Sequence, residues 1–256
     1  MGEAMLSAIL GKHLATVRSV TVSDVNQERR HYLTREYGVS VTDDNRQAVI
    51  GADIIVLAIK PQNLAEVMTG LKGLLKPEQL VLSIIAGARL NTICQGLGHQ
   101  AVVRAMPNTP AQISQGMTVW TATTQVTEQQ NEWASSILGA MGHEIAVADE
   151  DQIDMATAVS GSGPAYLFLF VEALVDAAVQ LGLSRDMAQE LVLTTVLGSS
   201  QLIEESGREP AELRRMVTSP GGTTAEALRE LTQGEFADLL ARAVRAAYER
   251  AKQLGS

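Results

Sequence analysis

The sequence predicts two domains, an α/β domain with a doubly wound sheet followed by an all-helical domain. Over residues 1–148, short runs of β-branched residues alternate with helical stretches. This alternation is typical of parallel strands that are connected by helices. From Asp149 onward the strand signals end and only helical periodicity remains. We therefore expect residues 1–148 to form the α/β domain and residues 149–256 to form the helical one.

Seven short segments of the first domain are expected to be strands, because each is rich in Val, Ile or Thr and is bounded by turn residues. They are Ser19–Ser23, Val39–Thr42, Asp53–Ala58, Leu80–Ile85, Ala101–Arg104, Met117–Thr121 and Glu144–Ala148. The third and fourth segments are apolar on both faces. Central strands that helices cover on each side have this composition.

The opening of the first domain is unusual. A dinucleotide-binding domain begins with a strand and a G-x-G-x-x-G turn, which places a pyrophosphate at a helix N-terminus. This sequence begins at Met1-Gly2-Glu3, already inside the first expected helix. We therefore expect a Rossmann-like domain with its first strand missing from this chain, and a sheet that exposes two strand edges.

Composition argues against several classes of function. A net charge of −9 and 4% aromatic residues do not suit a nucleic-acid-binding protein, which needs basic patches and stacking side chains. Cys94 is the only cysteine and is expected to be a small buried apolar residue. No metal site is expected, because the four histidines lack ligand spacing and are interpreted as surface or loop residues; they are His13, His31, His99 and His143.

No targeting or membrane-spanning segment is expected. The longest apolar run, Ala165–Val171, ends at Glu172 and is short of the ~20 residues that a bilayer requires. A cytoplasmic location is therefore expected. The helix that contains this run, Gly163 to Leu181, has its polar residues in one narrow stripe. A helix that is apolar nearly all round is buried nearly all round, which favours a homodimer over a monomeric bundle with a central helix.

Three segments combine Pro and Gly with small hydroxyl or amide side chains, and none has a His, Cys, Asp or Lys placed to act on a substrate. Such segments offer backbone N–H groups and weak hydroxyl donors. They suit the binding of an anion beside a cofactor that brings its own reactivity. The segments are Val103–Ala111 (VRAMPNTPA), Ser160–Tyr166 (SGSGPAY) and Ser219–Leu228 (SPGGTTAEAL).

In their order and spacing, these segments resemble the pyrroline-5-carboxylate reductase family, over essentially the whole chain. SPGGTT is the most specific part. The resemblance implies reduction of 1-pyrroline-5-carboxylate, a cyclic imine carboxylate, to L-proline by hydride transfer. It implies NADPH as cofactor with NADH also accepted, and a homodimer that in this family also forms larger rings.

Two other functions were weighed against this one. The β-hydroxyacid dehydrogenases use a lysine on a helix of the second domain, and this chain has no lysine between Lys76 and Lys252. A non-catalytic NAD(P)-binding regulatory or scaffold protein stays open as the alternative.

Two groups of cofactor-binding residues follow from the chain itself. Asp24 ends the second strand of the fold, where an acidic residue holds a ribose 2′-hydroxyl, and Arg29 and Arg30 follow it closely; a plain turn is the other interpretation of Asp24. Lys60 leaves the next apolar strand at its carboxyl end, and Pro61 keeps it extended. The resemblance supplies the other positions. It places Met1 and Gly2 at the end of the glycine turn, Asn45 toward the adenosine and Asn108 toward the nicotinamide; alone, Asn45 would be interpreted as a helix cap. The expected cofactor-binding residues are therefore Met1, Gly2, Asp24, Asn45, Ala58, Ile59, Lys60, Pro61, Ile84, Ile85, Ala86 and Asn108.

The substrate-binding residues are expected in the third segment. Thr223 and Glu226 have the spacing of a capping box with Thr223 as N-cap, so a helix is expected to start there. Two glycines before a helix expose N–H groups to a carboxylate, although an ordinary capped helix has the same pattern. The resemblance implies that Ser219, Gly221, Gly222, Thr223 and Thr224 bind the substrate, with Thr224 near the ring nitrogen as the catalytic residue. Ser160–Pro164 is interpreted as mainly structural.

Overall fold

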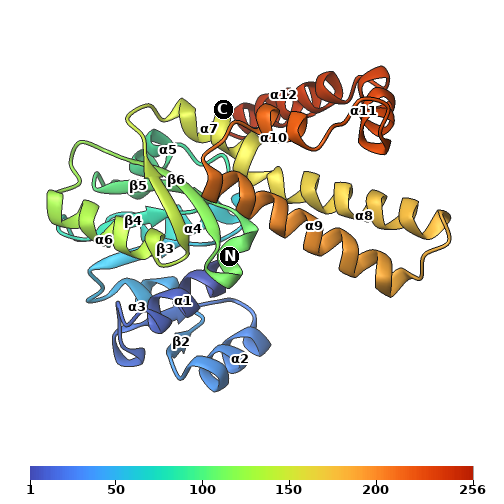
Figure 1. The fold of residues 1–256 in the computed structure, drawn as a ribbon. Helices are drawn as coiled ribbons and strands as arrows, with labels where there is room; N and C mark the ends of the chain where they lie inside the picture. The colour runs from blue at the N-terminus through green and yellow to red at the C-terminus, as the bar shows by residue number, and fades with distance from the viewer. Residues whose placement is uncertain (256) are drawn as a thin grey trace. The chain divides into compact units, whose positions relative to one another are not determined.

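The computed structural model describes residues 1–255, which divide into two compact units (Figure 1). The first unit contains Met1–Pro164 and the C-terminal residues from Ala247 onward, and the second contains Ala165–Ala246. The boundary expected after residue 148 falls just past the last strand. The compact units divide later because α7 (Asp151–Ala156) and η4, a π-helical turn at Thr157–Gly161, pack against the strands of the first unit.

The first unit alternates strands and helices. Its strands are β1 (Thr21–Ser23), β2 (Ser40–Thr42), β3 (Ile54–Leu57), β4 (Leu80–Ser83), β5 (Val102–Pro107), β6 (Gly116–Ala122) and β7 (Gly142–Ala146). Its other helices are α1 (Gly2–Gly11), α2 (Gln27–Tyr37), α3 (Asn45–Val49), α4 (Leu64–Leu71), α5 (Leu90–Leu97) and α6 (Glu128–Gly139), with short 3₁₀ turns η1 (Val17–Ser19), η2 (Pro61–Asn63) and η3 (Thr109–Ile113). Each expected strand is present, with shifted ends.

The sheet is mixed rather than wholly parallel. Strands β3, β4 and β5 are parallel, β6 runs antiparallel to β5, and β7 is parallel to β6. The expectation of an all-parallel sheet is therefore wrong at β6. The connection from β5 to β6 holds only η3, and a parallel crossover needs a dozen or more residues.

Two helical layers cover the five-stranded sheet. Alternate residues of each strand point to opposite faces, so Leu80 and Leu82 pack with α1 and α6, whereas Val81 packs with α3, α4 and α5. Cys94 belongs to the second of these layers and is 7% exposed, which confirms its expected burial. Burial also raises the pKa of its thiol. His99 is buried as well, with Nε2 2.7 Å from the carbonyl oxygen of Gln79, so its interpretation as a surface residue is wrong.

The first unit contains two separate sheets with an open edge on each. β1 pairs only with β2, and β3 pairs only with β4. Helix α1 joins the two, because Met5 packs in the core of the five-stranded sheet and Leu6 in the core of the two-stranded sheet. In a dinucleotide-binding fold the first strand of the sequence lies between the strands that correspond to β1 and β3. Therefore β3, although both its faces are covered, is an edge strand here and not the central strand expected.

The second unit is entirely helical. It contains α8 (Gly163–Gln180), α9 (Arg185–Ser206), α10 (Pro210–Met216), α11 (Thr223–Gln233) and most of α12 (Phe236–Leu254). Large apolar side chains of α8 lie at the surface: Phe168 is 62% exposed and Leu169 is 66% exposed. Only Val175 of this helix is buried. The helical run Asp151–Gln180 is also long and apolar enough to cross a membrane by length and composition alone, despite the acidic residues that it contains.

We expect the edges of β1 and β3 to accept one added strand. A five-residue Val/Ile strand followed by Gly-Ala-Gly-Asn, fused before Met1, offers N–H and C=O groups to both edges. The fused protein should melt at a higher temperature than the chain of 256 residues, and hydrogen exchange in Ile54–Leu57 should slow. A control fusion with two prolines in the strand lacks the donors and should show neither effect. Identical behaviour of the two fusions would contradict the prediction.

Candidate functional site

The carboxyl ends of the parallel strands present most of the predicted cofactor-binding residues. β3 is followed by Ala58, Ile59 and Lys60, and β4 is followed by Ile84, Ile85 and Ala86. Because β3 and β4 are parallel and in register, these two segments leave the sheet at the same edge. Lys60 is extended, with φ −72° and ψ 146°, and Pro61 is the first residue of η2. The conformation expected for Lys60 before a proline is thereby confirmed.

The N-terminus of α1 reaches the end of β3. A Cβ atom on Gly2 would lie 3.0 Å from the Cβ of Ala58, so glycine allows this close approach. The first intrahelical hydrogen bond runs from Met5 N to Met1 O, and no side chain caps the helix. The N–H groups of the first turn are therefore available to an anion, and they fit the phosphate end of a dinucleotide.

The turns after β1 and β2 carry Asp24 and Asn45. Asp24 Oδ1 accepts a hydrogen bond of 2.8 Å from Asn26 N, and the Asp24 carbonyl accepts one of 2.7 Å from Arg30 Nη1. Asp24 thus stabilises its own turn, and its contact with a ribose stays a prediction. The interpretation of Asn45 as a helix cap is wrong, because Asp44 caps α3 by accepting from Arg46 N at 3.0 Å. The side chain of Asn45 therefore has no role in capping this helix.

A cluster that the sequence analysis missed joins α1 to α2. Glu3 accepts hydrogen bonds from Arg29 and from the hydroxyls of Tyr32 and Tyr37, both at 2.9 Å. The hydrogen bond from Arg29 is the main cause that lowers the pKa of Glu3 below its ordinary value. Arg29 also lies 5.0 Å from the Tyr32 ring centroid. This cluster fixes the helix whose N-terminus would meet a pyrophosphate.

Asn108 holds together two segments that are distant in the sequence. Its Nδ2 donates to the carbonyl of Ser160 at 3.0 Å, and its Oδ1 accepts from Met117 N at 2.8 Å. Both ends of the amide thus contact the backbone of the protein. Contact of Asn108 with a nicotinamide stays a prediction.

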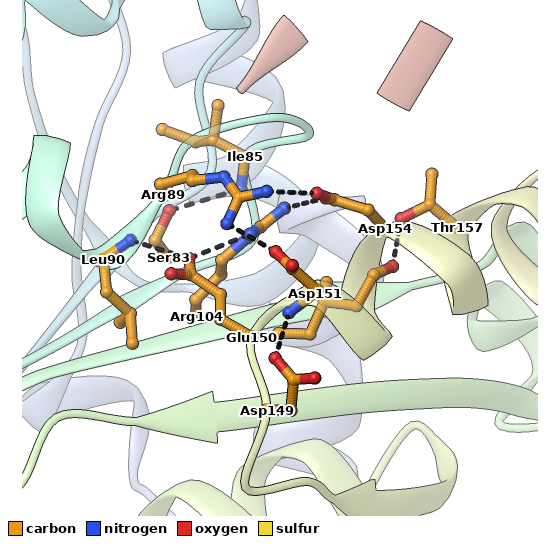
Figure 2. Close-up of polar contacts among 11 residues, drawn as sticks. Ser83, Ile85, Arg89, Leu90, Arg104, Asp149, Glu150, Asp151, Asp154 and Thr157 are labelled. Atoms are coloured by element: carbon orange, nitrogen blue, oxygen red, sulfur yellow. Dashed lines mark hydrogen bonds and ion pairs between the residues drawn. The ribbon is translucent and has the colours of Figure 1, made fainter. Parts of the chain in front are cut away.

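A buried group of charges joins β5 to α7, and Figure 2 shows it in close-up. Arg104 of β5 is 2% exposed and Asp154 of α7 is 1% exposed. Arg104 Nη2 lies 2.6 Å from Asp154 Oδ1, and Arg104 Nη1 lies 2.9 Å from Glu150 Oε1. Arg89, which precedes α5, lies 2.9 Å from Asp154 Oδ2 and 2.7 Å from Asp151 Oδ1. The hydrogen bond from Arg89 also lowers the pKa of Asp151.

The sequence contains a signal for this group. Arg104 is a charged residue within an otherwise apolar strand, and an acidic run begins at Asp149. A buried arginine needs a carboxylate partner, so the two features belonged together.

In the second unit, the predicted substrate loop is a tight turn. Gly222 N donates to Ser219 O at 3.0 Å, and Gly221 has φ +69°, a left-handed conformation that favours glycine. A Cβ atom on Gly222 would lie 2.4 Å from Ser219 Oγ. Gly221 is therefore required by its left-handed backbone, whereas a side chain at Gly222 would force Ser219 Oγ to move.

The turn leads directly into α11. The N-cap of α11 is Gly222, and Thr223 is its first helical residue, so the expected capping box with Thr223 as N-cap is wrong. Glu226 pairs with Arg229 at 2.8 Å instead. Glu226 N makes the first intrahelical bond, to Gly222 O at 3.3 Å. Because no side chain caps α11, the N–H groups of Thr223, Thr224 and Ala225 face outward from the helix start, as an anion-binding site requires. Thr224 is half-buried.

The second segment, Ser160–Tyr166, contains the end of η4 and the start of α8. Thr157 Oγ1 donates to Ile153 O at 2.7 Å and Ser160 Oγ donates to Ala156 O at 3.0 Å. These hydroxyls therefore hold the backbone of the turn.

Two family models match separate parts of the chain. Residues 150–254 match the family model described as pyrroline-5-carboxylate reductase dimerisation. Residues 1–87 match the model described as NADP oxidoreductase coenzyme F420-dependent.

The chain is also similar to individual proteins over its whole length. It is 41% identical over 255 residues to the pyrroline-5-carboxylate reductase of Synechocystis, covering 100% of this chain and 95% of that one. It is 44% identical over 236 residues to the Pseudomonas aeruginosa enzyme of the same name, covering 92% and 86%. The solved structure of the Coxiella burnetii pyrroline-5-carboxylate reductase superposes with a TM-score of 0.89 at 37% identity, covering 100% and 95%. That of the Plasmodium falciparum pyrroline carboxylate reductase with NADP bound superposes with a TM-score of 0.91 at 30% identity, with the same coverage.

Proposed function

The chain belongs to the pyrroline-5-carboxylate reductase family, and we propose that it reduces 1-pyrroline-5-carboxylate to L-proline with NAD(P)H, the last step of proline biosynthesis. The observation that carries this proposal is the uncapped start of α11 behind the Gly221-Gly222 turn. This helix start offers backbone N–H donors for a carboxylate. It also offers the hydroxyl of Thr224, the second residue of the helix. The chemistry of a cyclic imine acid needs these two kinds of group.

The first unit provides the groups that would hold the cofactor. A reduced nicotinamide supplies the hydride when the cofactor is bound. The first-turn N–H groups of α1 would hold the pyrophosphate, and the segments after β3 and β4 would line the dinucleotide. Arg29 and Arg30 lie close to Asp24 and offset the repulsion between that carboxylate and a 2′-phosphate. NADPH is therefore the expected cofactor, with NADH also accepted.

The second unit provides the groups that would hold the substrate. The N–H groups of Thr223 and Thr224 would bind the carboxylate, together with Ser219 and the two glycines of the turn. The hydroxyl of Thr224 would donate a hydrogen bond to the ring nitrogen, directly or through water, as hydride transfer to the protonated imine returns a lone pair to that atom. An imine is basic enough to be partly protonated near neutral pH, so the reaction needs no strong side-chain acid. Rate enhancement would come from holding hydride donor and acceptor in position.

Assembly and location complete the proposal. Helix α8 exposes large apolar side chains and lies within the residues that match a dimerisation family model. A second copy of the chain covers these side chains in a homodimer. A larger ring of such dimers, as the resemblance implies, and a cytoplasmic location are part of this proposal.

The activity itself gives the first test. The purified chain, and the same chain with the added N-terminal strand, should oxidise NADPH when pyrroline-5-carboxylate is supplied, and proline should accumulate in equal amount. Omission of the imine is the control. If both proteins bind NADPH but neither oxidises it, the chain is instead a non-catalytic NAD(P)-binding protein.

The second test concerns Thr224. Thr224→Ala removes one hydroxyl, and a lost hydrogen bond to an uncharged group costs about 0.5–1.5 kcal/mol, or up to about tenfold in kcat/KM. If the bond forms mainly in the transition state, the loss should fall on kcat. Thr232→Ala, which removes a hydroxyl bonded to Leu228 O on the same helix, should change nothing. Weaker NADPH binding in Thr224→Ala, with unchanged turnover of the imine, would contradict this assignment.

The companion variant probes the turn. Gly222→Ala should raise the KM for the imine, because the new Cβ would overlap Ser219 Oγ and displace the donors. Gly70→Ala adds a methyl group where nothing lies within 4 Å and serves as the matched control. Affinity for NADPH should stay the same in both variants. An unchanged KM in Gly222→Ala would mean that the turn does not hold the substrate.

The third test concerns assembly. Leu169→Arg places a charge on the exposed apolar face of α8 and should shift the protein from dimer to monomer, or leave it insoluble, because an unpaired charge is costly in an interface. Ile50→Arg, at an apolar residue of the first unit that is 78% exposed, is the control and should stay dimeric. Sedimentation at micromolar concentration separates the outcomes. A wild-type chain that sediments as a monomer would overturn the dimer.

A further inference from the structure

We propose that Arg104 and Asp154 are a positioning pair, which holds the π-turn η4 and the loop after β4 in one arrangement beside the Asn108 loop and thereby sets the rate of the proposed reduction. This inference rests on the proposed function but concerns residues that carry no expected role in it. Both side chains are almost completely buried and neither is expected to touch substrate or cofactor.

The pair is costly to bury. Buried charges lose their hydration, and an ion pair in a protein interior recovers little net stability compared with apolar side chains of the same size. Arg104 nevertheless interrupts a strand in which Val102, Val103 and Ala105 are at most 1% exposed. The role of the pair is therefore better sought in the geometry that it imposes than in stability.

The carboxylates of Asp154 and Glu150 each join β5 to the segment that follows β4. Asp154 Oδ1 contacts Arg104 of β5, and its Oδ2 contacts Arg89. Arg89 lies two residues beyond Gly87, at the end of the loop that follows β4. Glu150 makes a parallel connection, because its Oε1 accepts both from Arg104 Nη1 and from Leu90 N at 2.8 Å. Figure 2 shows the two guanidinium groups converging on these carboxylates.

The π-turn η4 continues α7 without a break. A π-turn is a rare conformation that is frequently found at functional sites. Two anchors on one stretch of chain hold it: Arg104 binds Asp154 before the turn, and Asn108 binds the carbonyl of Ser160 within it. Directly after Ser160, a Cβ atom on Gly161 would lie only 3.3 Å from Met106 Cε. The turn is thus fixed against β5 and the residues that follow it.

A consequence for catalysis follows from where these anchors lie. The second anchor, Asn108, is the residue that we assign to the nicotinamide end, whereas the donors assigned to the pyrophosphate lie on α1. A shift of about 1 Å at such a residue can cost about 100-fold in rate. Loss of the pair should therefore lower kcat and leave the affinity for NADPH nearly unchanged.

The experiment compares three variants with the wild type. Asp154→Asn keeps the size of the side chain and removes its charge, and should lower kcat at least about tenfold. Because a single change also leaves a buried cation short of a partner, the second variant replaces both residues, Arg104→Met with Asp154→Leu. In this double variant Arg89 still pairs with Asp151, and Glu150 still accepts a hydrogen bond from Leu90 N. The melting temperature should therefore return toward that of the wild type. Asp176→Asn breaks an exposed pair with Arg185 and is the matched control.

Two readouts decide the outcome. The double variant should melt close to the wild-type temperature but keep the low kcat, and hydrogen exchange of residues 157–163 should be faster than in the wild type. If the double variant recovers both the kcat of the wild type and its slow hydrogen exchange at residues 157–163, the pair is only structural and the proposal is overturned. Unchanged exchange in both variants would overturn it even if the wild type proved inactive, which separates its failure from that of the proposed function.

Discussion

The rest of the first unit depends on the parallel register of β3, β4 and β5. Leu57, Ser83 and Arg104 lie in one row across the three strands. The segments Ala58–Lys60 and Ile84–Ala86 directly follow this row and therefore leave the sheet side by side, whereas β5 continues to Pro107 before Asn108. Neighbouring carboxyl ends are the ligand-binding edge of open α/β sheets. The register supplies the position of the site, and the side chains supply its details.

The same row explains why α7 belongs with the first unit although it follows the last strand. Arg104 ends the row with a buried cation, and the acidic face of α7 satisfies it. A boundary drawn from strand signals at residue 148 thus marks the end of the sheet, whereas the compact unit ends at Pro164.

Periodicity predicted the elements of this fold well, because strand and helix patterns are local. It located α8 to within a residue and each strand to within a few residues. It failed where the answer depends on partners distant in the sequence: the antiparallel β6, the burial of His99 against Gln79, and the Arg104–Asp154 pair across fifty residues. The N-cap of α11 was wrong by one residue because glycine and threonine both serve as caps. Of the predicted cofactor-binding positions, those after β3 and β4 come together in the structure, and their contacts with a ligand stay predictions.

The two helix starts assigned to ligands differ from others in the part of the chain that the structure describes. Side chains cap α2, α3, α6 and α9, and the carboxylate of Glu150 reaches the first N–H of α5. Helices α1 and α11 have Met1 and Gly222 at the N-cap and receive no such side chain. A polar cap would have stabilised each helix by about 1 kcal/mol, yet it would have used the donors that an anion needs. Helices α4 and α10 also lack a side-chain cap, so free donors alone do not single out α1 and α11. We assign these two to a phosphate and a carboxylate because of their places beside the end of β3 and behind the Gly221-Gly222 turn. A reaction whose hydride comes from a cofactor requires little more from the protein than two such anchors and a fixed geometry around them.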